Sequence, residues 1–357
     1  MRLRVLALAS YPIEAASSRY RIVQFIEPLA ERGIDVEFKP LLDASLFAAL
    51  YSPKQLLPRL PRVAFRAAMC IRDAFRAADV VLVQREAMLF GPPFVEWLAR
   101  LRRPLVLDLD DATYLSYVSP VYGRVARWLK WPGKTDRLID RAHIVICGNP
   151  TVAAYASARG AETAIVPTIV DTSVFHPREP APRAVPVIGW IGTHATFPFL
   201  ARLLPLFERL AREQHFRLRI IGSGRSDIEV PGVEVETRPW RMDAEAEEFR
   251  ALDVGLYPLD DDAWNAGKSG LKAVQYLASG VPFVMSPVGI CATIGIEGHT
   301  HFAATTDDEW LDALRRLAGD AELRANMGRA GRVFAERTYS IDRHADALAD
   351  ILRKAAS

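Results

Sequence analysis

The residues best suited to chemistry lie in one stretch, residues 267–284, which read GKSGLKAVQYLASGVPFV. The pattern predicts a glycine-rich turn, a short helix, a Gly-Val-Pro break and an apolar strand. The amino end of a helix carries unpaired N–H groups and a partial positive charge, so it favours an anion. Lys268 lies in the turn, and Lys272 follows four residues later, one helical turn on along the same face. Two lysines at a helix start predict a diphosphate ligand, and hence a nucleotide-linked substrate.

The composition predicts a globular enzyme of two domains. The chain has 357 residues, more than one ordinary core organises, and half of them are hydrophobic and a quarter charged. A net charge of +2 argues against a dedicated nucleic-acid binder. The cysteines, Cys70, Cys147 and Cys291, lie far apart without metal-ligand spacing, which predicts thiols in a reducing cytoplasm.

The amino terminus predicts neither a signal peptide nor a membrane span. Residues 1–10 hold two arginines and then a short apolar run that breaks at Tyr11 and Pro12, whereas a signal peptide needs a longer apolar core. No stretch approaches the ~20 apolar residues of a membrane span. We therefore expect a cytoplasmic protein whose first apolar run is a buried strand.

Short apolar runs alternate with helical segments along the whole chain, which is typical of parallel sheets covered on both faces. We expect strands at residues 5–9, 36–38, 80–83, 104–107, 143–147, 164–167, 187–192, 217–222, 254–257 and 282–285. We expect helices at residues 19–32, 199–213 and 341–354. The proline-rich stretch 176–184 is the best linker candidate. The fold class predicted is α/β, with two doubly wound Rossmann-like domains, 1–176 and 184–335, and a site in the cleft where strand ends face each other.

The stretch 267–284 resembles the donor-site signature of GT-B glycosyltransferases, and of glycosyltransferase family 4 in particular. Those enzymes usually carry Glu-x7-Glu, then a small residue, Gly and Pro before a strand. Here the Gly-x-Pro end is present, but Gly267 stands at the first Glu position and Gln275 at the second. In the family the first Glu contacts the donor sugar and the second holds the ribose hydroxyls. Gln275 retains hydrogen-bonding capacity without charge, whereas Gly267 has no side chain to offer.

The resemblance assigns donor contacts to several other residues. Lys268 and Lys272 look like compensating diphosphate ligands that stabilise the leaving group. Gly192 and Thr193 would face the phosphates through backbone N–H groups, and His194 would be a phosphate or sugar contact or else an ordinary polar residue beside a helix. The remaining donor-binding candidates are Arg238, Trp240, Ser269, Gly270 and Leu271. The resemblance also implies that the carboxyl-terminal helix, within residues 336–357, packs back across both domains.

Family members place the loop after the first strand over the donor phosphates and the acceptor. That loop carries Ser17, Ser18, Arg19 and Arg21 here. The alternative is that the serines cap the next helix and the arginines are surface charges. Arginine at a helix start opposes the helix dipole, which favours an anion-binding role.

Charged residues also follow the third and fourth predicted strands. Arg85 and Glu86 are acceptor candidates, with a salt-bridged loop as the alternative. Asp108, Asp110 and Asp111 are three carboxylates at one strand end, able to bind a cation, bind a substrate hydroxyl or act as a base. GT-B enzymes generally need no bound metal, so the resemblance favours acceptor positioning, with Asp110 and Asp111 as catalytic candidates and helix capping as the alternative. No cofactor and no metal are expected.

Two regions of the first half are rich in arginine and aromatic residues. They hold Arg59, Arg62, Arg66, Arg72 and Arg76, and then Arg124, Arg127, Trp128, Lys130, Trp131, Lys134 and Arg137. Arginine interleaved with tryptophan suits an anionic membrane surface, and the alternative is a solvated helix face. Membrane binding would make the protein peripheral on the inner face of the membrane and its acceptor lipid-linked.

The expected function is transfer of a sugar from a nucleotide-sugar donor to a glycan or lipid-linked acceptor, as in polysaccharide biosynthesis, with the retention of configuration that the resemblance implies. Two alternatives stay open. A non-catalytic nucleotide-sugar-binding protein is favoured by Gly267 and Gln275, and a sugar-nucleotide epimerase can share the architecture. The sequence argues against a dehydrogenase, because no G-x-G-x-x-G follows the first strand.

Overall fold

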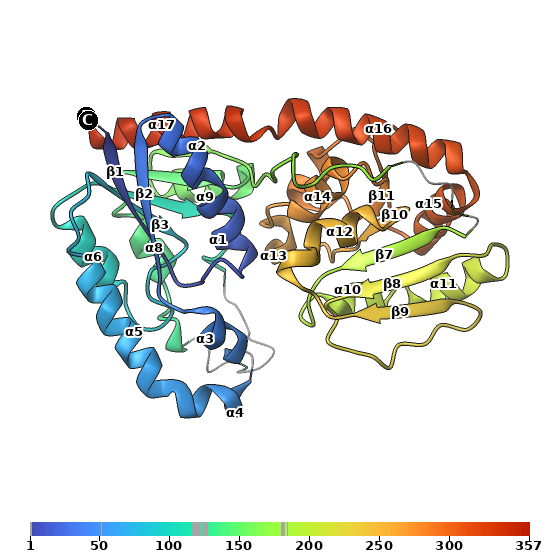
Figure 1. The fold of residues 1–357 in the computed structure, drawn as a ribbon, viewed down its shortest axis with the longest axis horizontal. Helices are drawn as coiled ribbons and strands as arrows, with labels where there is room; N and C mark the ends of the chain where they lie inside the picture. Colours follow the sequence, from blue (N-terminus) through green and yellow to red (C-terminus); the bar gives the residue numbers. More distant parts are fainter. Residues whose placement is uncertain (1, 51, 116–122, 124–127, 180–182, 184) are drawn as a thin grey trace. The chain divides into compact units, whose positions relative to one another are not determined.

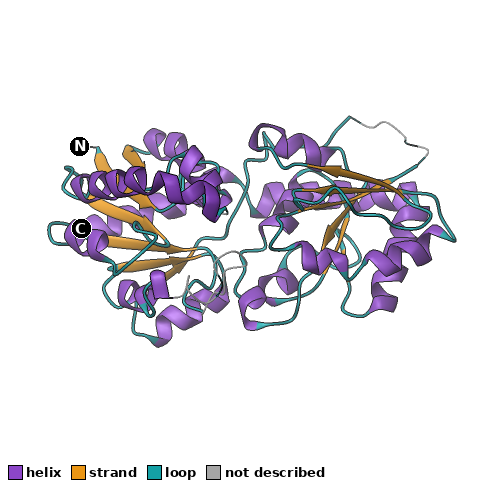
Figure 2. Ribbon diagram, turned by 90° about the horizontal axis from the view of Figure 1, so that it is seen from below, coloured by secondary structure: helices purple, strands orange, loops and turns teal. Residues whose placement is uncertain are grey.

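The computed structural model describes residues 2–50, 52–115, 123, 128–179, 183 and 185–357. The chain forms two compact units. The N-terminal unit comprises Met1–Thr168, Gly267–Ser269 and Ile341–Ser357, and the C-terminal unit comprises Ile169–Ala266 and Gly270–Ser340. Each unit has one six-stranded sheet with helices on both faces (Figures 1 and 2). The predicted linker, 176–184, falls within the C-terminal unit, and its residues 180–182 and 184 lie outside the described residues.

The sheet of the N-terminal unit is parallel throughout, in the order β2-β1-β3-β4-β5-β6. Its strands are β1 (Leu3–Ala9), β2 (Ile34–Pro40), β3 (Val80–Gln84), β4 (Leu105–Leu109), β5 (Ile144–Cys147) and β6 (Thr163–Ile165). Strands β3, β4 and β5 are buried along their whole length, because helices cover both faces. The strand order reverses between β1 and β3, and the carboxyl ends at such a point are where ligands of doubly wound sheets bind.

Helices of the N-terminal unit include α1 (Ala16–Arg21), α2 (Ile26–Glu31), α3 (Ala44–Ala49), α6 (Phe94–Arg100), α8 (Lys134–Ile139), α9 (Pro150–Ala158) and α17 (Ile341–Ala356). A single helix over residues 19–32 was a wrong prediction. Helix α1 ends at Arg21, a short 3-10 turn follows, and α2 starts afresh. Pro28 explains the restart, because it has no N–H and is tolerated only in the first turn of a helix.

The carboxyl-terminal helix α17 belongs to the N-terminal unit and packs against α2. The Arg32 Nε atom donates to Asp346 Oδ1 over 2.6 Å, and the Arg353 guanidinium donates to the Arg32 carbonyl over 2.7 Å. The helix before it, α16 (Ala321–Thr338), belongs to the C-terminal unit.

The sheet of the C-terminal unit is also parallel, in the order β12-β11-β10-β7-β8-β9. Its strands are β7 (Val187–Ile191), β8 (Arg217–Ile221), β9 (Glu234–Arg238), β10 (Val254–Tyr257), β11 (Phe283–Met285) and β12 (Phe302–Ala303). Here the order reverses between β7 and β10. Two doubly wound parallel sheets confirm the predicted α/β fold class.

Helices of the C-terminal unit include α10 (Phe197–Ala201), α11 (Leu204–Ala211), α12 (Glu245–Arg250), α13 (Ala263–Ala266), α14 (Leu271–Ala278) and α15 (Asp307–Gly319). The helix predicted over 199–213 is split, because Pro205 starts α11 and cannot continue α10. Helix α14 packs closely on α16 (Figure 1). A Cβ atom on Gly328 would lie 2.2 Å from the Gly280 carbonyl oxygen, so this contact requires glycine.

A buried histidine lies beside the edge of this sheet. His301 stacks on Phe283 with ring centroids 5.1 Å apart, and its Nδ1 atom lies 2.9 Å from the Thr300 hydroxyl. Burial lowers the pKa of His301 to about 4 from 6.5, since the protein interior solvates the imidazolium poorly.

The low pKa of His301 predicts a loss of stability on acidification. Between pH 6.5 and 4 the unfolded chain binds a proton that the folded unit refuses, so the free energy of unfolding falls as pH falls through this window. We expect a loss of about 2 kcal/mol between pH 7 and pH 5 from this residue. Denaturant unfolding at both pH values should show a smaller loss in His301→Phe than in the unsubstituted protein, whatever the variant's stability at pH 7. Equal losses in the two proteins would contradict the assignment.

Candidate active site

Four of the donor-side candidates, Gly270, Leu271, Lys272 and Gln275, lie just before or within α14 in the C-terminal unit. Gly270 precedes the helix with φ +69°, a left-handed conformation that favours glycine, and a Cβ there would lie 2.3 Å from Ile294 Cδ1. Leu271 and Lys272 are the first two helical residues. Because α14 begins at Leu271, Lys268 lies before the helix, and the predicted one-turn spacing between the two lysines does not apply.

Lys272, Gln275 and Glu245 form one polar network. The Lys272 ammonium donates to Gln275 Oε1 over 3.0 Å and lies 3.9 Å from Glu245 Oε1. Gln275 Nε2 donates to the same Glu245 oxygen over 3.2 Å. Gln275 and Glu245 are buried, while 23% of the Lys272 side chain is exposed. The face of Phe249 lies 5.2 Å from the Lys272 nitrogen. The network therefore holds one accessible cation over a buried amide and a buried carboxylate.

No sequence pattern indicated Glu245 as a site residue. It is the first residue of α12, and no local pattern distinguishes it from its acidic neighbours Glu247 and Glu248. The structure places its carboxylate beside Gln275, at the position where the resemblance expects a glutamate. A buried carboxylate from a different helix therefore lies beside the amide at residue 275.

In the loop after β7, two backbone N–H groups that were predicted to face phosphates have other partners. The Gly192 N–H donates to the Ile221 carbonyl over 3.0 Å, and the Thr193 N–H donates to the Thr196 hydroxyl over 3.0 Å. Both groups expected to face phosphates are therefore engaged within the protein. The side chains of Thr193 and His194 are exposed.

Arg238 is the last residue of the edge strand β9, which pairs with β8, and Trp240 follows two residues later. The Arg238 guanidinium is held by Glu236 over 2.6 Å and by Glu248 over 3.0 Å. Trp240 is partly exposed and lies beside Gly222, whose added Cβ would come 3.1 Å from the Trp240 Cβ. Trp240 is thus the aromatic surface at the carboxyl end of β8, while Arg238 is committed to two carboxylates.

In the N-terminal unit, Arg21 and Asp108 form a buried ion pair. Arg21 Nε and Nη2 donate to Asp108 over 2.9 and 2.8 Å, and Nη1 donates to the Val166 carbonyl over 2.7 Å. The two side chains are 1% and 4% exposed. Burial raises the pKa of Asp108 above its ordinary value, and Arg21 opposes that rise. Because the Arg21 guanidinium is buried and paired, it is not accessible to an acceptor substrate. This argues against the substrate contact predicted for Arg21.

Arg85 lies directly after β3 and bridges two further carboxylates, which lie directly after β4. Its Nε donates to Asp110 over 2.5 Å and its Nη2 donates to Asp111 over 2.6 Å, while Gln84 Nε2 donates to Asp110 over 3.1 Å. Burial alone would raise the pKa of Asp110, but the Arg85 guanidinium holds it below its ordinary value. Burial and the Asp110 charge raise the pKa of Asp111. Both carboxylates are therefore paired with the same guanidinium.

The segment Gly267–Ser269 is anchored in this unit by side chains from two strand ends. Asp111 Oδ1 accepts from the Ser269 N–H over 3.1 Å. Asn149 Nδ2 donates to the carbonyls of Gly267 and Lys268 over 2.9 and 3.1 Å. A Cβ on Gly267 would lie 2.2 Å from the Ala112 Cβ. Close packing thus accounts for glycine where the resemblance expects glutamate.

Sequence reasoning missed Asn149. Its Oδ1 accepts from the Val152 N–H and caps α9, and the Asn-Pro pair at residues 149–150 is the signal for that cap. The cap leaves the amide N–H₂ group facing Gly267 and Lys268, which no local pattern indicates.

The other acceptor candidates are tied into the unit by short contacts. The Ser18 hydroxyl donates to the Tyr11 carbonyl over 2.7 Å, and Arg19 donates to the carbonyls of Ile13 and Glu14 over 3.0 and 3.2 Å. Helix α1 has Ala15 as its N-cap with no side-chain bond, so neither Ser17 nor Ser18 caps it. Glu86 accepts from the buried Lys134 over 3.0 Å, which matches the salt-bridged alternative.

Known proteins resemble this chain in part. Residues 185–320 match the family model described as glycosyl transferases group 1. The match covers these residues alone, and they are called the group 1 domain below. This domain includes Lys272, Gln275 and Glu245, and its match supports an enzyme of the transferase class.

Two curated relatives are D-inositol 3-phosphate glycosyltransferases. The protein from Saccharomonospora viridis is 37% identical over 30% of this chain and 24% of its own length, and that from Pseudarthrobacter chlorophenolicus is 29% identical over 38% and 31%. The chain thus spans about a quarter to a third of these relatives.

Solved structures resemble the chain over nearly its whole length. Sucrose-phosphate synthase from Thermosynechococcus elongatus has a TM-score of 0.70 at 15% identity over 99% of both chains. Anabaena HepE in complex with UDP-glucose has a TM-score of 0.68 at 13% identity, over 99% of this chain and 100% of its own. These likenesses show the GT-B fold.

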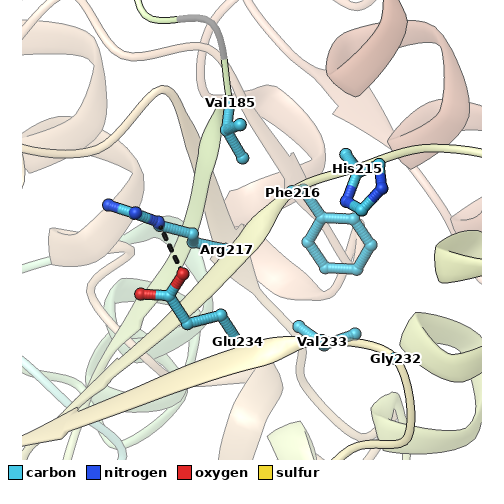
Figure 3. A pocket seen from close by; sticks show the side chains of 7 residues that line it. All are labelled: Val185, His215, Phe216, Arg217, Gly232, Val233 and Glu234. Carbon is cyan, nitrogen blue, oxygen red and sulfur yellow. Dashed lines mark hydrogen bonds and ion pairs between the residues drawn. The ribbon is translucent and has the colours of Figure 1, made fainter.

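Hollows elsewhere do not coincide with these residues. One of about 420 Å³ is lined by Val185, His215, Phe216, Arg217, Gly232, Val233 and Glu234 (Figure 3). These residues lie at the amino ends of β8 and β9 and just before β7, opposite to the edge where the group 1 domain carries its candidates. Among the described residues no group of three or more His, Cys, Asp or Glu side chains is arranged to hold a metal ion. No helix within the described ranges is long and apolar enough to cross a bilayer.

Proposed function

We propose that the protein transfers a sugar from a nucleoside diphosphate sugar to the hydroxyl of a glycan or lipid-linked acceptor, with retention of configuration. The observation that carries the proposal is the Lys272–Gln275–Glu245 network at the amino end of α14, inside the group 1 domain. A cation at a helix start beside two buried acceptor groups suits a diphosphate joined to a ribose.

The charges of this network fit the two halves of a nucleoside diphosphate. The exposed Lys272 ammonium and the helix start favour the negative diphosphate, and their attraction grows as the glycosidic bond breaks and its electron pair moves to the leaving phosphate oxygen. The Gln275 carbonyl and the Glu245 carboxylate are hydrogen-bond acceptors for ribose hydroxyls. Trp240 offers an aromatic face for the base.

A uridine nucleotide is the first donor to test. Anabaena HepE, which shares the GT-B fold, has been crystallised with UDP and with UDP-glucose. Phosphorylated inositol belongs in the acceptor panel, because the curated relatives are named for it.

Nucleotide-sugar binding without turnover is the second candidate. It is favoured by Gly267, whose close packing on Ala112 leaves no room for the side chain that contacts the sugar in the resembling family. The two candidates agree on binding and differ on catalysis, so each requires its own measurement.

A thermal-shift screen of nucleoside diphosphates and nucleotide sugars tests the binding step. A ligand that binds only the folded protein raises its Tm, by an amount that grows with ligand concentration above the Kd. We expect stabilisation by one nucleotide family, reduced in Lys272→Met and kept in Lys39→Met, whose lysine pairs with Glu37 in the other unit. Stabilisation by none of the ligands would overturn the donor site. Binding without sugar transfer to any acceptor, or to water, would select the second candidate.

A further inference from the structure

An almost continuous helical segment on the N-terminal unit exposes large apolar side chains. It consists of α4 (Pro53–Leu56), the 3-10 turn η2 (Leu57–Arg59) and α5 (Leu60–Asp73), which follow one another without a gap (Figure 1). Val63, Ala67 and Cys70 face the core of the unit. On the other side Leu57 is 65% exposed, Leu60 49% and Phe65 63%. The segment thus exposes three large apolar side chains besides those that face the core, and exposed apolar groups gathered on one short segment mark an interaction surface.

Before its last residue, Asp73, the same segment carries only positive charges. Residues 44–72 contain Lys54, Arg59, Arg62, Arg66 and Arg72 and no aspartate or glutamate. Arg62 pairs with Asp43 and Arg72 with Asp73, at the two ends of the acid-free stretch. Within the described part of the chain, no carboxylate lies at ion-pair distance from Lys54 or Arg59. An apolar face flanked by such cations complements a surface with a negatively charged outer layer and an apolar interior.

This segment is a narrower surface than the basic regions marked in the sequence. Arg76 is held by Glu37 and Asp73, and Arg66 donates to the carbonyls of Pro40 and Leu41. In the second region Lys134 is buried against Glu86, and Arg124 and Arg127 lie outside the described residues. The predicted patch as a whole is therefore not a free basic surface.

We propose that the exposed face of residues 53–68 docks on a bilayer containing anionic lipids. Leu57, Leu60 and Phe65 enter the boundary between headgroups and acyl chains, and Lys54 and Arg59 meet the lipid phosphates. A helix with an apolar face, basic flanks and low overall hydrophobicity lies in the interface plane instead of crossing the membrane. Docking does not depend on the proposed transfer reaction, and it makes a lipid-linked acceptor the natural partner of that reaction.

Vesicle co-sedimentation of the full chain tests the proposal. We expect binding to phosphatidylcholine vesicles that contain phosphatidylglycerol, and much weaker binding to phosphatidylcholine alone. Leu57→Ser/Phe65→Ser should weaken binding by about tenfold or more, because two large side chains lose their burial. Lys54→Gln/Arg59→Gln should weaken it by about fivefold per residue removed. The matched control is Ile296→Ser/Val333→Ser, which removes two similarly exposed side chains from the C-terminal unit.

Three outcomes would overturn the proposal. They are no binding to anionic vesicles, equal loss in the control variant, and binding that survives both pairs of substitutions. Light scattering distinguishes the other occupant, a second copy of the chain. A dimer that Leu57→Ser/Phe65→Ser converts to a monomer, with no vesicle binding, would assign the face to self-association. Activity on a water-soluble acceptor reports on the proposed transfer separately, so failure of one idea leaves the other standing.

Discussion

Arg21→Met is expected to destabilise the N-terminal unit by about 3–5 kcal/mol, because it leaves the Asp108 carboxylate buried without its partner. The two side chains are almost fully enclosed, and Arg21 also satisfies the Val166 carbonyl. Denaturant unfolding at neutral pH measures the change. An effect below about 1 kcal/mol, the range of surface pairs, would contradict this role for the pair.

The double variant Arg21→Met/Asp108→Leu separates the pair from its burial. Replacing a buried ion pair by apolar residues of similar volume is often neutral, so the double variant should recover much of the stability that Arg21→Met loses. The control is Arg2→Met, which breaks a pair with Asp35 whose side chains are 62% and 47% exposed. That substitution should cost about 0–1 kcal/mol.

The role of Arg21 in a buried ion pair could not be predicted from the sequence. Arginine is rarely buried unless paired, and the partner of Arg21, Asp108, lies 87 residues away on β4. The sequence indicated Asp108 at the end of a strand and Arg21 in the loop and helix start after the first strand, but these types and positions suit a binding site and an internal ion pair equally well. Only the packing of α1 against the sheet distinguishes the two.

The predicted strands were mostly correct because burial on both faces leaves continuous apolar runs, as in Val80–Gln84. Strand β9 was missed because it carries charge. Its glutamates 234 and 236 pair with Arg217 and Arg219 on β8, so the edge of the sheet is stabilised by ion pairs that no hydrophobic pattern reveals. The sequence does predict the helix divisions at Pro28 and Pro205, because proline is tolerated only in the first turn of a helix. The expected helices did not take these prolines into account.

The two departures from the Glu-x7-Glu pattern have different physical meanings. Gly267 is required by its contact with Ala112, so its missing side chain is a consequence of packing. Gln275 keeps a buried hydrogen-bonding role, and Glu245 brings a carboxylate to it from α12. Sequence alone registers both as losses, whereas the structure shows a steric constraint in one case and a carboxylate hydrogen-bonded to the amide in the other.

Lys272→Met is expected to lower kcat for sugar transfer by about 10²–10³-fold, the typical loss on removing one group that stabilises transition-state charge. The variant keeps the length of the side chain and its contact with Phe249, so the effect isolates the charge. The donor KM should change less, because the attraction is strongest when the diphosphate leaves. Steady-state kinetics with a fixed acceptor provide both constants, and Lys39→Met is the matched control.

For Glu245, which we propose to face the ribose, the opposite kinetic pattern is expected. Glu245→Gln keeps shape and hydrogen-bonding groups but removes the negative charge of the carboxylate beside Gln275, and it should raise the donor KM more than it lowers kcat. A purely structural Glu245 would instead lower the Tm and leave the KM unchanged. If Lys272→Met retained full kcat, leaving-group stabilisation would have to come from elsewhere, and the network would be a folding element of the group 1 domain rather than its catalytic centre.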